Sequence, residues 1–184
     1  MHWISPTDQN TQDDYLNMLL ESDFSEVLHD LGTQMNLNGL VAYHLTFIAV
    51  SKCTQGYIHS DFQGVNGKAF NIIIPIQTFS EQEELYVQDD TEYEYIASYR
   101  YKLNQGIALG DYAYHATAPC DYTEEKGMRL AATVYVADVN AENVERIMVD
   151  YTQYYPPVDE EYLMSIAGRH WKRDNNESSY FRKQ

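Results

Sequence analysis

The central part of the chain, from about residue 40 to residue 139, is a succession of short apolar segments separated by turn-forming residues. β-Branched and aromatic residues are frequent in these segments, which is typical of β-strands. About eight such segments with a turn every 8–15 residues or so are the pattern of a β-sandwich or a barrel. The expected strands are 40–50 (one long strand or two short ones), 57–62, 70–76, 84–87, 93–101, 106–111, 114–117 and 128–138.

Helical periodicity precedes the strand block. Residues 1–12 are a polar lead-in, and from residue 13 the apolar residues recur at helical spacing. This spacing predicts helices at about 13–21 and 24–35. The candidate N-caps are Asp13 or Asp14 for the first helix, and Ser22 or Asp23 for the second.

A second helical region follows the strand block. Helices are expected near 141–150 and 160–167, and the charged residues 173–184 are expected to fray. The length of 184 residues favours one domain. We therefore expect a single mainly β (α+β) domain, made of supporting helices (13–38), a β-roll (40–139), and C-terminal helices with a tail (141–184).

The chain is strongly acidic, with 12 Lys and Arg against 28 Asp and Glu, and a formal net charge of −16. Nucleic-acid and anionic-membrane partners are not expected, because both require basic side chains to neutralise phosphates. The longest apolar stretch, 37–50, is too short to span a bilayer. Residues 1–10 show no secretory signal, so the sequence predicts a soluble, cytoplasmic protein.

Two cysteines, Cys53 and Cys120, allow at most one disulfide and form no C-x-x-C motif. This excludes a disulfide framework and a zinc knuckle. A metal-binding role for Cys120 is the weaker hypothesis, and a small buried hydrophobic side chain the stronger one. Among the histidines, His44 is expected to lie in the core.

Two histidines and one aspartate are candidate metal ligands. His59-Ser60-Asp61 is an H-x-D motif, and residues i and i+2 of a strand point to the same face. His115 follows a glycine turn and is the candidate third ligand. Two imidazoles and one carboxylate are the ligand set of non-haem Fe(II) oxygenases. The alternative interpretation is a hydrogen-bonded surface pair and a solvated turn histidine.

Arg129 opens the strand expected at 128–138. A guanidinium group there can hold the far carboxylate of a metal-bound 2-oxo acid through two hydrogen bonds. The alternative is an exposed arginine paired with Glu124 or Glu125.

The order of these motifs resembles the Fe(II)/2-oxoglutarate-dependent dioxygenase superfamily. It consists of H-x-D, a buried Ile-rich strand, a short E-L-Y-V strand, a G-x-A-L-G-D turn, His and then Arg, from about residue 40 to 139. The resemblance implies a double-stranded β-helix, also called a jelly roll. It also implies that His59, Asp61 and His115 bind iron, and that Arg129 anchors 2-oxoglutarate.

The resemblance further implies an oxidoreductase that uses Fe(II), 2-oxoglutarate and O₂, with hydroxylation of a small molecule or a protein side chain as the default outcome. The sequence does not identify that substrate. Ala131 stands where many members carry Ser or Thr, so another hydroxyl (Tyr57, Tyr43 or Thr133) is expected to contact 2-oxoglutarate. Asn71 and Tyr57 are further candidates for cosubstrate binding; the alternatives are an interior polar group satisfied by the protein for Asn71 and packing inside the roll for Tyr57.

Two other functions fit the same strand pattern. One is a cupin-like metalloenzyme that does not use 2-oxoglutarate, which turnover without the 2-oxo acid would reveal. The other is a non-catalytic jelly-roll binding module with a vestigial metal site, which absence of Fe(II) binding would reveal.

Overall fold

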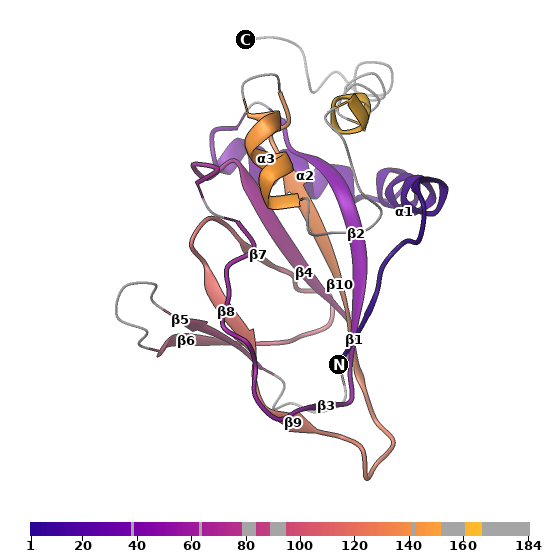
Figure 1. Ribbon diagram of the computed structural model, residues 1–184, viewed down its shortest axis with the longest axis vertical. Coiled ribbons are helices and arrows are strands. Elements are labelled where there is room, and N and C mark those ends of the chain that lie inside the picture. The colour runs from indigo at the N-terminus through magenta and orange to yellow at the C-terminus, as the bar shows by residue number, and fades with distance from the viewer. Residues whose placement is uncertain are drawn as a thin grey trace.

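A five-stranded antiparallel sheet forms the base of the fold in the computed structural model, which describes residues 1–37, 39–62, 64–78, 84–88, 95–140, 143–151 and 161–166. Its central strand is buried along almost its whole length, as expected for a strand covered on both faces. Figure 1 shows the long strands side by side. In spatial order they are β1 (His2–Ile4), β2 (Val41–Val50), β10 (Arg129–Ala137), β4 (Ala69–Gln77) and β7 (Ile107–Leu109).

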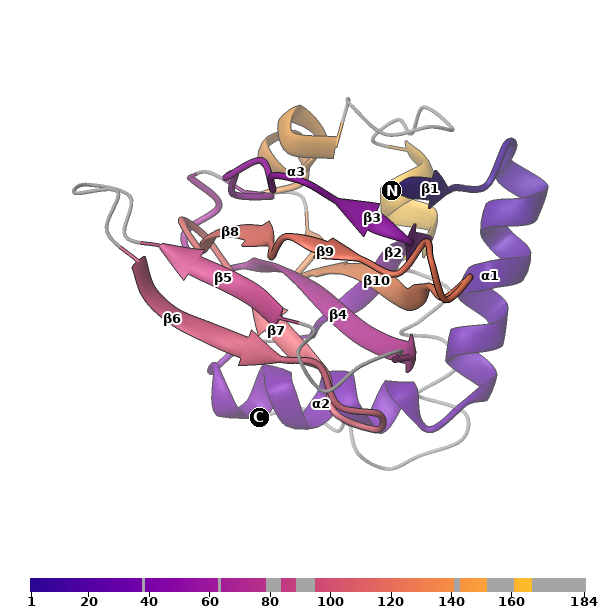
Figure 2. The same cartoon turned by 90° about the horizontal axis from the view of Figure 1, so that it is seen from below.

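Two smaller sheets lie against one face of the large sheet (Figure 2). A three-stranded sheet has the order β6 (Tyr95–Arg100), β5 (Glu84–Gln88), β8 (Tyr114–Thr117). A two-stranded ladder pairs β3 (Lys52–Cys53) with β9 (Cys120–Asp121). An apolar cluster joins the layers and contains Ile73, Leu109 and Ala131 from the large sheet, Leu85 from β5, and Tyr101.

Helices cover the opposite face of the large sheet (Figure 1). They are α1 (Gln9–Glu21), α2 (Phe24–Gln34) and α3 (Val144–Tyr151), and residues 161–166 are also helical. Leu16, Leu28 and Ile147 belong to the main core cluster together with Val134 and Val136 of β10. Burial of this apolar face is the main stabilising contribution to the helix–sheet packing. Within the described residues, no helix has the length and apolar character needed to cross a membrane.

Most of the expected strands are confirmed, with bounds that shift by one or two residues. Residues 41–50 form one strand, and not two. Residues 57–62 are the exception, because they contain an isolated bridge at His59 and no strand. The chain bends at Asp61, directly after the bridge, and turns again at Gly64, Asn66 and Gly67, which all adopt positive φ.

Short elements near the N-terminus were not expected from the pattern. Residues 1–12 are not a simple lead-in, since they contain β1 and the first turn of α1. Asp8, and not Asp13 or Asp14, caps α1 by accepting a hydrogen bond from Thr11 N at 2.9 Å. For α2, Asp23 occupies the N-cap position without a side-chain bond, and Ser22 Oγ accepts from Phe24 N. Parts of the expected elements lie outside the described part of the chain. They are residues 93–94 of the expected strand, 160 and 167 of the expected last helix, and the tail 173–184.

His44 on β2 is fully buried, as the sequence predicts, and burial lowers its pKa to about 4. The ordinary pKa of histidine is near 6.5. Between this pH and about pH 4, His44 is therefore protonated in the unfolded chain but neutral in the folded protein. Stability should therefore fall as the pH drops from about 6.5 to 4, by about 3 kcal/mol from this residue. The urea midpoint of His44→Gln should depend less on pH in this window than that of the parent. An equal pH slope in both proteins would contradict the prediction, and the exposed His2→Gln is the matched control.

Candidate metal centre

His59 and His115 lie opposite each other in a single antiparallel bridge. The backbone N–H of each donates to the carbonyl oxygen of the other, at 3.1 Å from His59 and 2.8 Å from His115. Opposed residues in an antiparallel pair extend their side chains to the same face. The two imidazole rings are accordingly neighbours, with centroids 4.6 Å apart.

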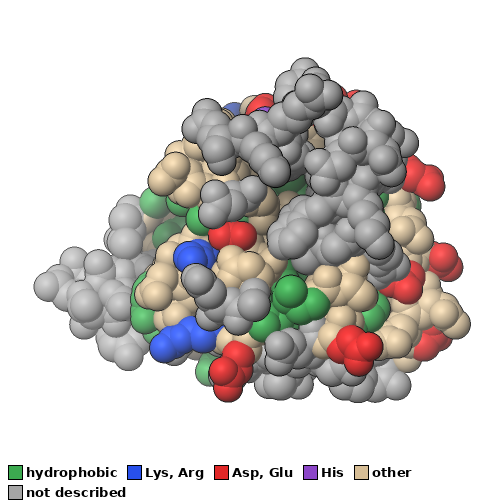
Figure 3. Space-filling view, turned by 90° about the horizontal axis from the view of Figure 1, so that it is seen from above, with side chains coloured by type: hydrophobic (Ala, Val, Ile, Leu, Met, Phe, Trp, Pro, Cys, Tyr) green, Lys and Arg blue, Asp and Glu red, His purple; other side chains and the backbone are tan. Residues whose placement is uncertain are grey.

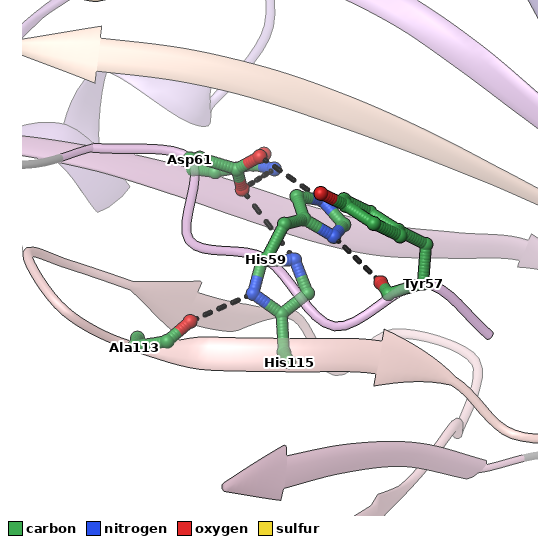
Figure 4. A network of polar contacts seen from close by, with 6 residues as sticks. Tyr57, His59, Asp61, Ala113 and His115 are labelled. Atoms are coloured by element: carbon green, nitrogen blue, oxygen red, sulfur yellow. Dashed lines mark hydrogen bonds and ion pairs between the residues drawn. The ribbon is translucent and has the colours of Figure 1, made fainter. Parts of the chain in front are cut away.

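The protein backbone orients both imidazole rings (Figure 4). Nδ1 of His59 lies 2.9 Å from the carbonyl oxygen of Tyr57, and Nδ1 of His115 lies 2.8 Å from that of Ala113. A carbonyl oxygen only accepts hydrogen bonds, so each Nδ1 carries the proton and each Nε2 presents a lone pair. Metal-binding histidines are commonly held in this way.

Asp61 completes the cluster between the two histidines. Its Oδ1 lies 3.6 Å from His59 Nε2, and its Oδ2 lies 3.5 Å from His115 Nε2. Asn71 Nδ2, on β4, donates to Asp61 Oδ2 at 2.7 Å and fixes the carboxylate. One ligand atom from each of His59, Asp61 and His115 lies within 4.8 Å of the others. Ligands about 2.1 Å from one ion are separated by about 3–4 Å, so the donor set fits one metal ion.

The electrostatics of the cluster favour a cation. The hydrogen bond with Asp61 raises the pKa of His59 although burial opposes this. Burial lowers the pKa of His115. Burial also acts to raise the pKa of Asp61, but the contacts with His59, His115 and Asn71 outweigh it and hold that pKa below its ordinary value. Asp61 is therefore an anion at neutral pH, as a metal ligand must be.

These residues line a pocket between the sheets. Leu85 of β5 and Ile73 of β4 contribute apolar walls, and Ile48 and Trp3 line the pocket from β2 and β1. Arg129, Tyr101 and Ala131 also face into it. The three candidate metal ligands and Arg129, the predicted cosubstrate anchor, thus line the same pocket.

Arg129 is buried against an aromatic ring. The residue is only 3% exposed, and its guanidinium carbon lies 4.3 Å from the ring centroid of Tyr101. Its Nε has no hydrogen-bond partner among the described residues. Glu124 and Glu125, the alternative partners, are exposed and form no ion pair with it in the described chain. No ion pair of Arg129 is formed by the residues that the structure describes, and a buried unpaired guanidinium is costly, so the pocket is suited to an anionic ligand.

Of the other sequence candidates, Tyr57 and Asn71 line the pocket, whereas Tyr43 and Thr133 are not among its lining residues. Tyr57 is 82% exposed and stacks on the His59 ring, with centroids 6.0 Å apart, so it covers the cluster and does not fill the roll. Asn71 uses its amide N–H to hold Asp61. Tyr43 lies in the helix-side core cluster and does not line the pocket. Thr133 lies on β10, four residues after Arg129, and is fully buried. Its hydroxyl has no hydrogen-bond partner among the described residues.

Tyr101 and the positioning role of Asn71 were missed by the sequence analysis. Tyr101 belongs to a run of alternating tyrosines that indicates only sheet packing. Its contact with Arg129 arises from the fold, and no local signal in the sequence marks it.

Substitution of Asn71 tests how Asp61 is held. Asn71→Ala should weaken the affinity for Mn(II) by about 10- to 100-fold, because a carboxylate without its supporting donor is poorly oriented. Calorimetric titration with Mn(II) measures this. Asn71→Gln, which retains an amide on a longer side chain, should recover part of the affinity. Equal affinities in the parent and Asn71→Ala would show that Asn71 has no such role.

Comparisons with known proteins agree with the fold. No family model and no curated protein matches the sequence. A 2OG-Fe(II) oxygenase family oxidoreductase from Burkholderia pseudomallei is 12% identical, with a TM-score of 0.52 over 71% of this chain and 58% of that chain. SnoN, a non-heme alpha ketoglutarate dependent epimerase from nogalamycin biosynthesis, is 9% identical, with a TM-score of 0.51 over 85% of this chain and 72% of that chain.

These similarities show the fold. The predicted fold class, a mainly β double-stranded β-helix with flanking helices, is confirmed. This chain spans less than two thirds of the length of the Burkholderia protein.

Proposed function

We propose that this protein is a non-haem Fe(II)- and 2-oxoglutarate-dependent oxygenase that hydroxylates a small molecule or a protein side chain. The observation that carries the proposal is the pocket shared by the His59–Asp61–His115 cluster and the buried guanidinium of Arg129. A mononuclear metal site with a nearby cationic side chain is the arrangement that binding of a 2-oxo acid requires. The solved structures with the same fold include a 2OG-Fe(II) oxygenase family oxidoreductase and a non-heme alpha ketoglutarate dependent epimerase, which supports the proposal.

The roles of the individual side chains follow from their contacts. His59 and His115 present Nε2 lone pairs because their Nδ1 atoms donate to backbone carbonyls. Asp61 supplies the negative charge, and Asn71 fixes its orientation. Fe(II) bound to this facial donor set would supply the redox chemistry that couples decarboxylation of 2-oxoglutarate by O₂ to substrate oxidation.

Arg129 would bind the distal carboxylate of 2-oxoglutarate. Its guanidinium stacks on Tyr101, which limits its rotation while leaving hydrogen-bond donors for a ligand. Apolar residues on the surrounding strands, Ile73, Leu85 and Ala131 among them, exclude water and strengthen the charge-assisted contact.

The surface charge bears on the substrate. Figure 3 shows Asp and Glu side chains on one face, where the described Lys and Arg side chains form no continuous basic area. Together with the net charge of −16, this argues against a polyanionic substrate such as a nucleic acid.

Release of succinate tests the proposed function. Purified protein supplied with Fe(II), 2-oxoglutarate and O₂ should form succinate, and a member of a panel of small molecules and peptides should increase the rate. Product formation without 2-oxoglutarate would favour the cupin-like metalloenzyme. Absence of metal binding would favour the non-catalytic binding module, because Asp61 and the two histidines would then serve only the structure.

A further inference from the structure

The two cysteines of the chain are directly opposed in the fold. Cys53 is the last residue of β3 and Cys120 the first of β9, and the two are partners in the antiparallel register. Opposed residues of such a pair project to the same side of the ladder. The other pair, Lys52 with Asp121, forms an exposed ion pair. The two thiols are both free.

Figure 2 shows this ladder next to β8, the strand that carries His115 of the candidate metal centre. After β3 the chain passes Gly56 and reaches His59, and β9 is reached from His115 through β8. Gly56 packs so tightly on β8 that a Cβ there would overlap the carbonyl oxygen of Thr117. The Cys53 thiol lies 3.9 Å from the same oxygen. The Cys53–Cys120 pair and the His59–His115 bridge therefore join the same two segments.

The backbone spacing of the pair suits a disulfide. Tyr122 N donates to Ser51 O at 2.8 Å, which makes that pair a hydrogen-bonded one. Pairs alternate along an antiparallel ladder, so Cys53–Cys120 is again a hydrogen-bonded pair, with Cα atoms about 5.5 Å apart. This is within the usual Cα spacing of a disulfide, while the Cβ atoms must approach by about 1–2 Å. Some strain of this kind makes a disulfide easier to reduce.

We propose that Cys53 and Cys120 form a reversible disulfide that fastens the two histidine-bearing segments together when the protein meets a low-molecular-weight disulfide such as oxidised glutathione. Cys120 is partly exposed whereas Cys53 is buried, so Cys120 reacts first. Its thiolate attacks one sulfur of oxidised glutathione, breaks the S–S bond and releases one glutathione.

The second step closes the bond. The Cys53 thiolate attacks the Cys120 sulfur of the mixed disulfide and displaces the second glutathione. In total, two protein thiols lose two electrons and two protons, and one oxidised glutathione is reduced to two molecules of glutathione. No other reactant is needed.

Peptide mass spectrometry under non-reducing conditions tests the bond. The full-length reduced protein, incubated with oxidised glutathione and then alkylated, should lose two hydrogens in mass and yield a Cys53–Cys120 cross-linked peptide that dithiothreitol abolishes. Cys120→Ser should yield no such cross-link. Native parent protein that carries only glutathione adducts, or two alkylated cysteines, would overturn the proposal.

The urea midpoint tests whether the bond fastens the segments. A disulfide that closes a long loop restricts the unfolded chain, so oxidation should raise the midpoint of the parent by about 1 M. Neither Cys120→Ser nor the second variant, Cys53→Ala, should show this rise in urea midpoint, because neither can form the intramolecular bond. A midpoint that oxidation leaves unchanged in the parent, despite a complete cross-link, would overturn the fastening role.

Discussion

Replacement of His115 or His59 by alanine is expected to abolish tight binding of Fe(II), or of Mn(II) as a redox-silent substitute. Each substitution leaves a site with two protein ligands, which holds a divalent ion poorly. His115 is buried and its Nδ1 is held by Ala113 O, so its Nε2 has a fixed position in the cluster. Calorimetric titration with Mn(II) under anaerobic conditions measures the loss.

Two controls separate this loss from general damage. His2→Ala removes an exposed histidine of β1 and should leave metal affinity unchanged. The urea midpoint of each variant shows whether the fold survives. If both His59→Ala and His115→Ala fold and retain the affinity of the parent, the assignment of the metal ligands is wrong.

Removal of the Arg129 side chain is expected to weaken binding of 2-oxoglutarate and to leave the affinity for the metal ion unchanged. Loss of one partner of a desolvated charge pair typically costs about 2–5 kcal/mol, which is about 30- to several-thousand-fold in affinity. Arg129→Lys retains the charge but not the planar pair of donors, so its loss should be smaller than that of Arg129→Ala. A titration of 2-oxoglutarate into the metal-loaded protein gives the dissociation constants.

A cation outside the pocket provides the matched control. Arg100 is exposed on β6 and does not line the pocket, so Arg100→Ala should bind 2-oxoglutarate like the parent. If Arg129→Ala also binds 2-oxoglutarate like the parent, the anchor lies elsewhere. The cosubstrate proposal then rests on the three metal ligands alone.

The long strands could be predicted from the sequence because each carries its own pattern. β10 and β4 are buried and rich in β-branched and aliphatic residues, which needs no tertiary information to recognise. β3 and β9 could not be predicted, since they have two residues each and exist only through their mutual pairing. For the same reason, the juxtaposition of Cys53 and Cys120 is invisible in the sequence.

The residues that the sequence proposes as metal ligands and cosubstrate anchor lie around one pocket, but the local structure at Asp61 differs from the expected one. The H-x-D spacing predicts a strand, whereas Asp61 follows a single bridge and lies in a bend. The carboxylate faces the histidines because Asn71 holds it there, a contact between segments that no spacing rule contains. The exposure of Tyr57 and the stacking of Tyr101 on Arg129 likewise depend on how the sheets pack.

Anaerobic addition of 2-oxoglutarate to the Fe(II)-loaded protein, followed by visible absorption, is the most direct measurement of the proposed function. Chelation of the iron by the 2-oxo acid produces a metal-to-ligand charge-transfer band. The band should grow with 2-oxoglutarate to saturation, should be absent without Fe(II), and should be lost in His115→Ala. A folded, Fe(II)-loaded parent protein that shows no band at saturating 2-oxoglutarate would contradict the proposal that His59, Asp61, His115 and Arg129 form an Fe(II)/2-oxoglutarate site.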